Sequence, residues 1–418
     1  MASFSFGVGN ARKLLRVPMY VGGRLATLLI PRSRDRWVFG CAWGVGDGAW
    51  ALWQHARGEG VRAVWLTGSA RDDLEAQARG IPWTRKRSLR GFWATARAGV
   101  IVITHGFGDV NRYAATGGVI VQLWHGIPLK RLGLDAPVTM QVTARRLPAL
   151  VQRILTRVVT AAYRRTQSRI RVLPAASQLV RGRLESAFGL PSTRVPVTGE
   201  PRTDVLFAGD ADERRARART AVAEATGALG TARLILYAPT WRDGAPDPAV
   251  PTPAEADRLR ALLTESDAVL LIRSHPHGAG AYARHAGERI RLLGADLVAE
   301  VTPLLPAIDV LITDYSSIVF DAALVPVPAV FLTPDLAAYA RTRGFYGTFR
   351  DVSGEAPATT WDEAIAQTRA VLTDPAEHAR RVAAARALSA RVHDVADGGG
   401  SARVFRAIQA ALAAERRS

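Results

Sequence analysis

The first half of the chain alternates short apolar runs with longer amphipathic stretches. Uninterrupted β-branched and aromatic residues predict buried strands, whereas an apolar stripe at helical spacing predicts a helix. The expected strands are 36–44, 61–68, 98–106 and 117–126, and the expected helix is 49–57. Because these runs are apolar throughout rather than alternating, they indicate parallel strands covered on both faces.

The second half repeats this pattern, with more polar strand ends. Apolar runs predict strands at 195–199, 233–241, 268–277 and 307–317, with a helix at 254–264. Ligands of parallel α/β sheets bind outside the carboxyl ends of the strands. We therefore expect these strand tails to converge on one binding crevice.

The length of the chain, 418 residues, exceeds what one hydrophobic core usually contains, so two lobes are expected. The sequence predicts an α/β protein with two Rossmann-like lobes. The expected parts are a basic arm at 1–36, an amino-terminal lobe at 37–193, a carboxyl-terminal lobe at 194–395 and a final helix at 396–418.

Two segments have the pattern of basic amphipathic helices. The arm at 1–36 carries seven Lys or Arg and one acid, and the segment 144–166 places Leu150, Ile154 and Val158 on one helical face with arginines on its flank. Such helices can lie in the interface of an anionic membrane, where each cation contributes roughly 1 kcal/mol. Ordinary helices that pack on a domain and expose a solvated arginine face are the alternative.

The charge of the chain indicates an acidic partner. The formal net charge is +18, and between residues 130 and 184 twelve Lys or Arg stand against one acid, Asp135. Nucleic acid, an anionic bilayer and a phosphorylated substrate each satisfy this pattern. Nucleic acid is disfavoured because Tyr163 is the sole aromatic residue between 144 and 171, too few for a base-stacking surface.

Composition also bears on location. The longest uncharged runs near the amino terminus fall short of the ~20 apolar residues that cross a bilayer. Arg16 and Arg24 interrupt the apolar stretch that a signal peptide would need. The single cysteine, Cys41, allows no internal disulfide and fits a reducing compartment. We therefore expect a peripheral protein on the cytoplasmic face of the cell membrane.

The stretch VQLWHGIPLKRLG, residues 121–133, departs furthest from a packing pattern. An apolar strand runs into a Trp-His pair, a Gly-Ile-Pro break and a Lys-Arg pair. The break predicts a turn that presents His125, and an imidazole with a pKa near 6.5 suits a general base. A structural turn histidine is the alternative. Lys130 and Arg131 are candidates for guiding a polyanionic acceptor, or else a solvated charge pair.

Five further motifs follow in order along the chain. They are TGEPRTDVLF (198–207), ILYAPTWRD (235–243), IRSHPH (272–277), ITDYSSIVFDAA (312–323) and RGFY (343–346). Together with QLWHGIPLKRLG (122–133), they resemble the CDP-glycerol glycerophosphotransferase family, the teichoic acid primases and polymerases of bacterial cell walls. The resemblance covers roughly residues 37–352.

This resemblance implies a fold of the GT-B type, with a CDP-alcohol held mainly by the carboxyl-terminal lobe. It implies transfer of glycerol phosphate, or a related polyol phosphate, from CDP-glycerol or another CDP-polyol to a hydroxyl of a lipid-linked or polymeric acceptor, with release of CMP. His125 and His275 match the catalytic histidines of the family. The positions that match substrate-binding residues are Trp124, His125, Gly126, Ile127, Pro128, Arg202, Pro239, Thr240, Arg273, Ser274, His275, Ser316, Ser317 and Asp321. Ile127 and Glu200 depart from the residues usual in the family, which leaves the identity of the polyol open.

The residue types suit this chemistry by themselves. Arg202 and Arg273 can bind phosphate oxygens in pairs, with surface ion pairs as the alternative. Ser316 and Ser317 stand where a helix start presents N–H groups to an anion, with simple capping as the alternative. The sequence around His275 offers no complete metal-ligand set. We therefore expect no protein-bound metal and no tightly bound cofactor, while Mg²⁺ can accompany the nucleotide substrate.

Two other functions remain compatible with the sequence. A GT-B glycosyltransferase that uses a nucleotide sugar would share the lobes and the phosphate site. A non-enzymatic basic protein that binds membranes or nucleic acid would need the basic segment alone.

Overall fold

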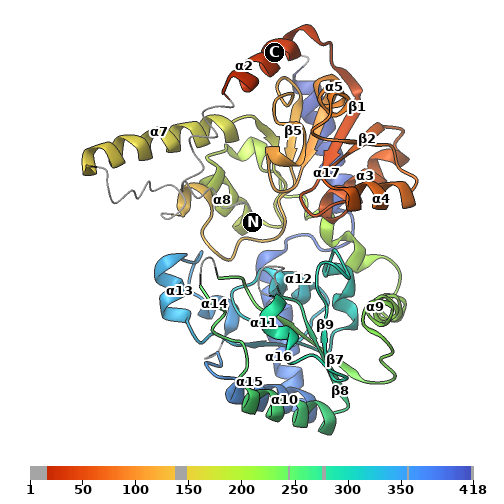
Figure 1. The fold of residues 1–418 in the computed structure, drawn as a ribbon, viewed down its shortest axis with the longest axis vertical. Coiled ribbons are helices and arrows are strands. Elements are labelled where there is room, and N and C mark those ends of the chain that lie inside the picture. The colour runs from red at the N-terminus through yellow and green to blue at the C-terminus, as the bar shows by residue number, and fades with distance from the viewer. Residues whose placement is uncertain (1–16, 137–147, 243–244, 275–278, 355–356, 416–418) are drawn as a thin grey trace. The chain divides into compact units, whose positions relative to one another are not determined.

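The computed structural model describes residues 17–136, 148–242, 245–274, 279–354 and 357–415, and it divides into two compact units (Figure 1). Unit 1 contains the described residues up to His125, those of Leu132–Asp204 and those from Asp394 onward. Unit 2 contains Gly126–Arg131 and the described residues of Val205–His393. Each unit is built on its own parallel sheet, which confirms the predicted α/β class.

Unit 1 has a six-stranded sheet in the order β3-β2-β1-β4-β5-β6. Its strands are β1 (Ser33–Gly40), β2 (Arg62–Thr67), β3 (Trp83–Arg85), β4 (Ala98–Ile103), β5 (Val119–Gln122) and β6 (Ile170–Val172). Its α-helices are α2 (Val17–Leu29), α3 (Asp47–Gly58), α4 (Ala70–Ala78), α5 (Leu89–Arg97), α7 (Ala149–Gln167), α8 (Gln178–Phe188) and α17 (Gly400–Ala414). Short 3₁₀ turns are η1 (Phe107–Asp109), η2 (Gly133–Asp135) and η3 (Ser192–Arg194), and η4 (Pro201–Phe207) runs on into unit 2.

The core of unit 1 is rich in aromatic rings. Trp37 and Phe39 on β1 pack with Trp65 on β2, all of them buried. Phe405 of α17 stacks on Trp37, with 5.4 Å between ring centroids. The final helix is therefore part of the core of unit 1, although more than two hundred residues separate the two rings in sequence.

Unit 2 has a five-stranded sheet in the order β11-β10-β7-β8-β9. Its strands are β7 (Arg233–Ala238), β8 (Ala268–Ile272), β9 (Ile290–Leu292), β10 (Val310–Thr313) and β11 (Ala329–Phe331). Its helices are α9 (Ala211–Thr226), α10 (Pro253–Glu265), α11 (Ala279–Ala283), η5 (Thr302–Ala307), α12 (Ile318–Leu324), α13 (Leu336–Thr342), α14 (Arg350–Ser353), α15 (Trp361–Thr373) and α16 (Pro375–Val392). Helices α10 and α15 share a buried cluster with the sheet.

The boundary between the units differs from the predicted division at residue 194. The segment 195–199 forms no strand of the second sheet, and Val197 makes a single parallel bridge with Ala175. Backbone hydrogen bonds hold this segment in unit 1, among them those from Ala175 N to Pro196 O (2.9 Å) and from Thr198 N to Ala175 O (3.0 Å). The chain therefore enters unit 2 only after Asp204.

The predicted final helix belongs to unit 1, and a contact with Asp204 holds its start there. The carboxylate of Asp204 accepts the backbone N–H groups of Gly400 (2.9 Å) and Ser401 (2.7 Å) at the start of α17. These donors have no partner within the helix, so the carboxylate caps its first turn. The structure thus joins 194–204 and the chain from Asp394 to the amino-terminal lobe.

Two helices of unit 1 leave apolar side chains exposed. In α7 no residue is buried, and Leu150, Ile154 and Val158 are at least half exposed. Helix α2 likewise exposes Leu28 and Leu29. Of the predicted segment 144–166, residues 144–147 lie outside the described residues. Within the described chain, no helix combines the length and apolarity that would let it cross a bilayer.

Candidate functional site

The turn after β5 carries the sequence motif with His125, and its backbone is strained. Trp124 adopts a φ of +64°, a region that non-glycine residues rarely occupy, and Gly126 follows at +122°. Such a conformation costs on the order of 1–3 kcal/mol and persists only where the surroundings enforce it. Leu123 N bonds to Ile103 O (2.8 Å), which fixes the start of this turn to the neighbouring strand β4.

A row of rings runs across the ends of the neighbouring strands β1, β4 and β5. His125 stacks on His105, with ring centroids 4.5 Å apart and planes 13° apart. Trp124 contacts His125 at 4.2 Å and Phe188 of α8 at 5.2 Å, and Trp43 after β1 meets His105 edge-on at 5.6 Å. The imidazole of His125 therefore lies in the middle of this ring row, half-buried, with its Nδ1 buried.

Arg202, predicted for a diphosphate, lies in unit 1. Its Nε is 3.2 Å from Oδ1 of Asp47, and both side chains are largely buried. Asp47 begins α3 with a φ of +59°, which is again rare for a residue other than glycine. A buried ion pair beside a strained helix start is a rigid charged element near the end of β1.

The residues that follow His125 belong to unit 2. Ile127 and Pro128 are buried, so their side chains pack rather than face solvent. Arg131 N bonds to Gly344 O (3.2 Å) and Tyr346 N bonds to Leu129 O (3.0 Å). The predicted motifs around residues 128–131 and 343–346 thus lie side by side as a short antiparallel pair.

Lys130 differs from a solvated charge. It is half-buried, with its ammonium 6.0 Å from the ring centroid of Tyr339. Burial lowers the pKa of Lys130 to about 8, opposed by the nearby carboxylate of Asp314. The side chain of Lys130 therefore lies against the ring of Tyr339 rather than fully in solvent.

In unit 2 the tails of the adjacent strands β10 and β7 meet at Asp314. Its carboxylate accepts the backbone N–H of Thr240 (2.9 Å) and the guanidinium of Arg242 (2.9 Å). The hydroxyl oxygen of Thr240 is buried and has no hydrogen-bond partner among the residues described. Pro239, directly before it, is buried as well. These two predicted binding positions thus share a tightly held strand end.

Arg242 forms the centre of a buried charged network. It donates two bonds to Asp335 (2.8 and 3.0 Å). Its guanidinium carbon also lies 4.9 Å from the ring centroid of Tyr315 and 4.8 Å from that of Tyr339, and these two rings stack on each other. Burial opposes its charge, but the bonds to Asp335 and Asp314 raise the pKa of Arg242 above its ordinary value. Burial raises the pKa of Asp314, with Arg242 opposing the rise.

Arg273 is held by backbone carbonyls. Its guanidinium donates to Leu293 O (3.1 Å), Val298 O (2.5 Å) and Ala299 O (2.8 Å), and burial lowers its pKa to about 10. In this structure the side chain fixes the loop after β9, a role that residue type alone did not indicate. Ser274 beside it is buried, and His275 lies outside the described residues.

The tail of β10 leads into α12, which carries the remaining predicted residues. Among the described residues, the side chain of Ser317 makes no hydrogen bond that caps the helix, and Ser316 Oγ accepts a long bond from Ile318 N (3.4 Å). Asp321 is 1% exposed, and its carboxylate accepts a bond from Thr302 Oγ1 (3.3 Å). This bond links α12 to η5 inside unit 2.

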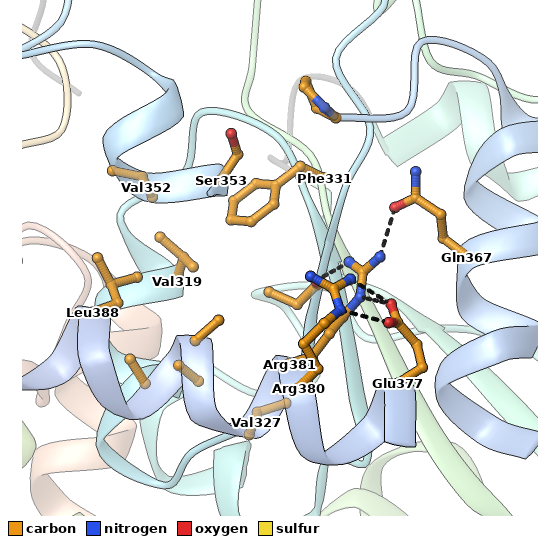
Figure 2. A pocket seen from close by; sticks show the side chains of 15 residues that line it. Val319, Val327, Phe331, Val352, Ser353, Gln367, Glu377, Arg380, Arg381 and Leu388 are labelled. Carbon is orange, nitrogen blue, oxygen red and sulfur yellow. Dashed lines mark hydrogen bonds and ion pairs between the residues drawn. The ribbon is translucent and has the colours of Figure 1, made fainter. Parts of the chain in front are cut away.

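A cavity of about 250 Å³ is lined by residues of α12, β11 and α16 (Figure 2). Val319, Val327 and Leu388 supply its apolar wall. Its charged groups bond to one another, since Arg380 and Arg381 both donate to Glu377. In the described part of the chain no group of three or more His, Cys, Asp or Glu side chains is arranged to hold a metal ion.

His105 and Arg242 make central contacts in the structure, but the sequence analysis did not identify either residue as a candidate. His105 has a detectable signal, because ITHG and LWHG both place a His-Gly pair directly after an apolar strand. Arg242 lies within the motif ILYAPTWRD, but its two partners stand 72 and 93 residues further on.

Comparison with known proteins connects these motifs to one family. The sequence model of the family described as CDP-Glycerol:Poly(glycerophosphate) glycerophosphotransferase matches residues 31–410. In Staphylococcus aureus (strain NCTC 8325 / PS 47), the teichoic acid ribitol-phosphate polymerase TarK is 28% identical over 233 residues, which are 55% of this chain and 42% of that protein. The teichoic acid glycerol-phosphate transferase of the same strain is 25% identical over 66% of this chain and 67% of its own length.

The fold has a close counterpart among solved structures. The structure of the wall teichoic acid polymerase TagF superimposes with a TM-score of 0.73 at 22% identity, covering 98% of this chain and 100% of that one. This similarity confirms the predicted fold of two α/β lobes, each built on a parallel sheet. The chain spans about two fifths of the length of the ribitol-phosphate polymerases that it matches.

Proposed function

This chain belongs to the CDP-glycerol:poly(glycerophosphate) glycerophosphotransferase family, and we propose on that premise that it transfers a polyol phosphate from a CDP-polyol to an acceptor hydroxyl. Glycerol phosphate from CDP-glycerol is the first candidate, and ribitol phosphate the second. Among relatives, both glycerol-phosphate and ribitol-phosphate enzymes of teichoic acid synthesis match this sequence.

The reaction needs alignment, deprotonation and charge neutralisation. The acceptor oxygen attacks the phosphorus that bears the polyol and forms a new P–O bond. The bond from that phosphorus to the bridging oxygen breaks, and CMP leaves with this oxygen. The acceptor proton passes to a base, for which we propose the imidazole of His125.

The observation that carries this proposal is the setting of His125. It stands at a strand end, after a residue with φ of +64°, and its ring is stacked on His105 at 4.5 Å. A general base must hold one orientation toward the proton it removes. A histidine needed only for a turn does not require this strained backbone.

Unit 2 is proposed to hold the CDP-polyol. The buried hydroxyl of Thr240, which has no hydrogen-bond partner among the described residues, is proposed to bond to the base or ribose, and Ser316 and Ser317 stand beside the N–H groups at the start of α12. Within unit 2, Arg273 and His275 are proposed to neutralise the diphosphate, Arg273 after it exchanges a carbonyl for phosphate oxygens. Arg202 belongs to unit 1, where it pairs with Asp47, and remains a predicted diphosphate ligand. The proposed reaction uses no tightly bound cofactor, and Mg²⁺ can accompany the nucleotide substrate.

The acceptor is proposed to be lipid-linked or polymeric and to be met at the cytoplasmic face of an anionic membrane. The support is the unburied helix α7, where apolar Leu150, Ile154 and Val158 stand beside Arg153 and Arg157. Such a face binds an anionic interface through both apolar burial and charge.

Flotation with phosphatidylglycerol vesicles tests the proposed membrane contact of α7. The variant I154S/V158S should float less than wild type, while S192A, on η3 of the same unit, should not differ; equal flotation of all three contradicts the proposal.

The substrate test uses the purified full chain and a lipid-linked acceptor. CDP-glycerol, CDP-ribitol and nucleotide sugars are each supplied, and nucleotide release and product length are measured. Release of CMP from one CDP-polyol, with its phosphate in the product, is expected. Transfer from a nucleotide sugar alone would instead establish a glycosyltransferase, and binding without turnover would leave a non-enzymatic protein.

A further inference from the structure

The ring that stacks on His125 is held more firmly than a chance neighbour would be. His105 follows β4 as His125 follows β5, and the two strands pair in parallel register up to Ile103 and Gln122. Beyond that point Gln122 Nε2 still donates to Thr104 O (2.5 Å), and both residues are buried. The two strand tails are thus tied together just before the histidines.

A single carboxylate organises the turn that carries His105. Asp109 Oδ2 accepts the backbone N–H groups of Thr104 (3.0 Å), His105 (2.7 Å) and Gly106 (3.2 Å). The hydroxyl of Thr104 lies 3.3 Å from the same oxygen. Because Asp109 is 3% exposed and all these bonds converge on one atom, the turn has little freedom to move.

The imidazole of His105 is also oriented. Its Nδ1 lies 3.1 Å from Thr104 Oγ1, whose proton can in turn face Asp109. Its Nε2 is buried and has no hydrogen-bond partner in the described residues. An N–H without a partner would be costly there, so the proton belongs on Nδ1 and Nε2 carries only its lone pair.

Burial keeps the ring of His105 neutral. Burial lowers the pKa of His105; the carboxylates of Asp109 and Asp47 oppose this, and Arg202 adds to it. At neutral pH a neutral ring therefore faces His125. A neutral flat partner restrains the base without adding a positive charge that would hinder it from accepting a proton.

We propose that His105 is a positioning residue, a flat platform tied to Asp109 and Thr104 that fixes the plane of the His125 imidazole. This inference rests on the proposed function, since it assigns a role to the base of that reaction. His105 touches neither substrate nor the reacting atoms in this account. It acts only through the stacked contact with His125.

Two variants distinguish the contribution of the flat ring of His105 from that of its ring nitrogens. His105→Phe keeps a flat ring of similar size, whereas His105→Leu fills the space without one. His378→Ala, an exposed histidine on α16 of unit 2, is the control for loss of a histidine. Thermal unfolding is the control that each variant is folded before the variants are compared.

The first readout requires no turnover. In full-length protein with labelled histidine, the ring protons of His125 are assigned by their absence in His125→Asn. A stacked ring shifts these protons upfield, so wild type and His105→Phe should share the shift and His105→Leu should lose it. An unchanged His125 signal in His105→Leu overturns the proposal, whatever the enzyme does.

The second readout is CMP release. His105→Leu should lower kcat about 10- to 100-fold with an unchanged KM for the CDP-polyol, and His105→Phe should recover most of the loss. Combining His105→Leu with His125→Asn should cost no more than His125→Asn alone. A His105→Phe variant as slow as His105→Leu, or a loss confined to KM, contradicts a positioning role. An inactive wild type, or full activity of His125→Asn, instead refutes the proposed function and leaves the first readout intact.

Discussion

Replacement of Arg242 by methionine should destabilise unit 2 severely. The guanidinium is 7% exposed and neutralises two carboxylates, Asp314 at 2.9 Å and Asp335 at 2.8 Å. Methionine keeps much of the volume but leaves both anions without their cation. Removal of one partner from a buried ion network costs about 3–5 kcal/mol, because the remaining charge stays desolvated. For a unit of this size that corresponds to a fall in Tm of about 6–20 °C.

The matched control is Arg258→Met in the same unit. Arg258 also binds a carboxylate with two nitrogens, Asp362 at 2.6 and 3.2 Å, but these side chains are 50% and 60% exposed. Exposed pairs contribute about 0–1 kcal/mol. The free energy of unfolding of each variant is measured by chemical denaturation, with hydrogen exchange of unit 2 as the readout. Equal losses of stability in Arg242→Met and Arg258→Met would refute the reasoning.

The pH dependence of the same variant gives an independent check. Burial raises the pKa of Asp314, and removal of Arg242 should raise it further. A carboxyl group with a raised folded-state pKa binds protons in the folded state first, so it gains stability as the pH falls. The stability deficit of Arg242→Met relative to wild type should therefore shrink as the pH falls from neutral. The triple variant R242M/D314N/D335N should recover part of the loss, since no buried anion remains.

Two further predictions concern other buried groups. Lys130→Met should stabilise unit 2 at neutral pH: burial lowers the pKa of Lys130 to about 8, so the cost of its charge is complete below that pH and disappears toward the unfolded value of about 10.4. A stability difference between Lys130→Met and wild type that does not narrow from pH 8 to pH 10 in thermal unfolding would contradict this. Cys41 is 3% exposed, and burial raises the pKa of its thiol, so it should resist a thiol reagent in the native protein and react once unfolded; rapid native labelling would contradict its burial.

Much of the fold could be predicted because long apolar runs are a strong signal. The strands expected around residues 98–106 and 233–241 appear as β4 and β7, starting at or next to the expected residue. The short strands β3, β6, β9 and β11 carry three residues each, too few to show a period. The segment 195–199 was wrongly predicted as a strand, because Val195 and Val197 favour one while Pro196 between them cannot donate to a ladder.

The domain boundary depended on contacts that no local pattern contains. The cap that Asp204 provides to α17 joins positions 196 residues apart. Likewise, nothing local distinguishes Arg273, which binds backbone carbonyls 20–26 residues later, from an arginine that faces solvent. The candidate base was accessible because the Gly-Ile-Pro break after His125 is visible in the sequence.

Pairing between strand tails decided the rest of the site. The stack of His105 on His125 follows from the adjacency of β4 and β5, which the alternating pattern suggests but does not fix. Asp314 and Arg242 meet for the same reason, since β10 and β7 are neighbours. Residue types at strand ends are therefore informative, while their partners require the strand order.

Release of CMP by His125→Ala tests the central claim most directly. Wild type, His125→Ala and His378→Ala are compared with the same CDP-polyol and acceptor, after thermal unfolding has shown that all three are folded. Loss of a general base should lower kcat by about 10²- to 10⁴-fold in His125→Ala, while His378→Ala stays at the wild-type rate. CMP release by His125→Ala within about threefold of wild type would contradict the assignment of the base.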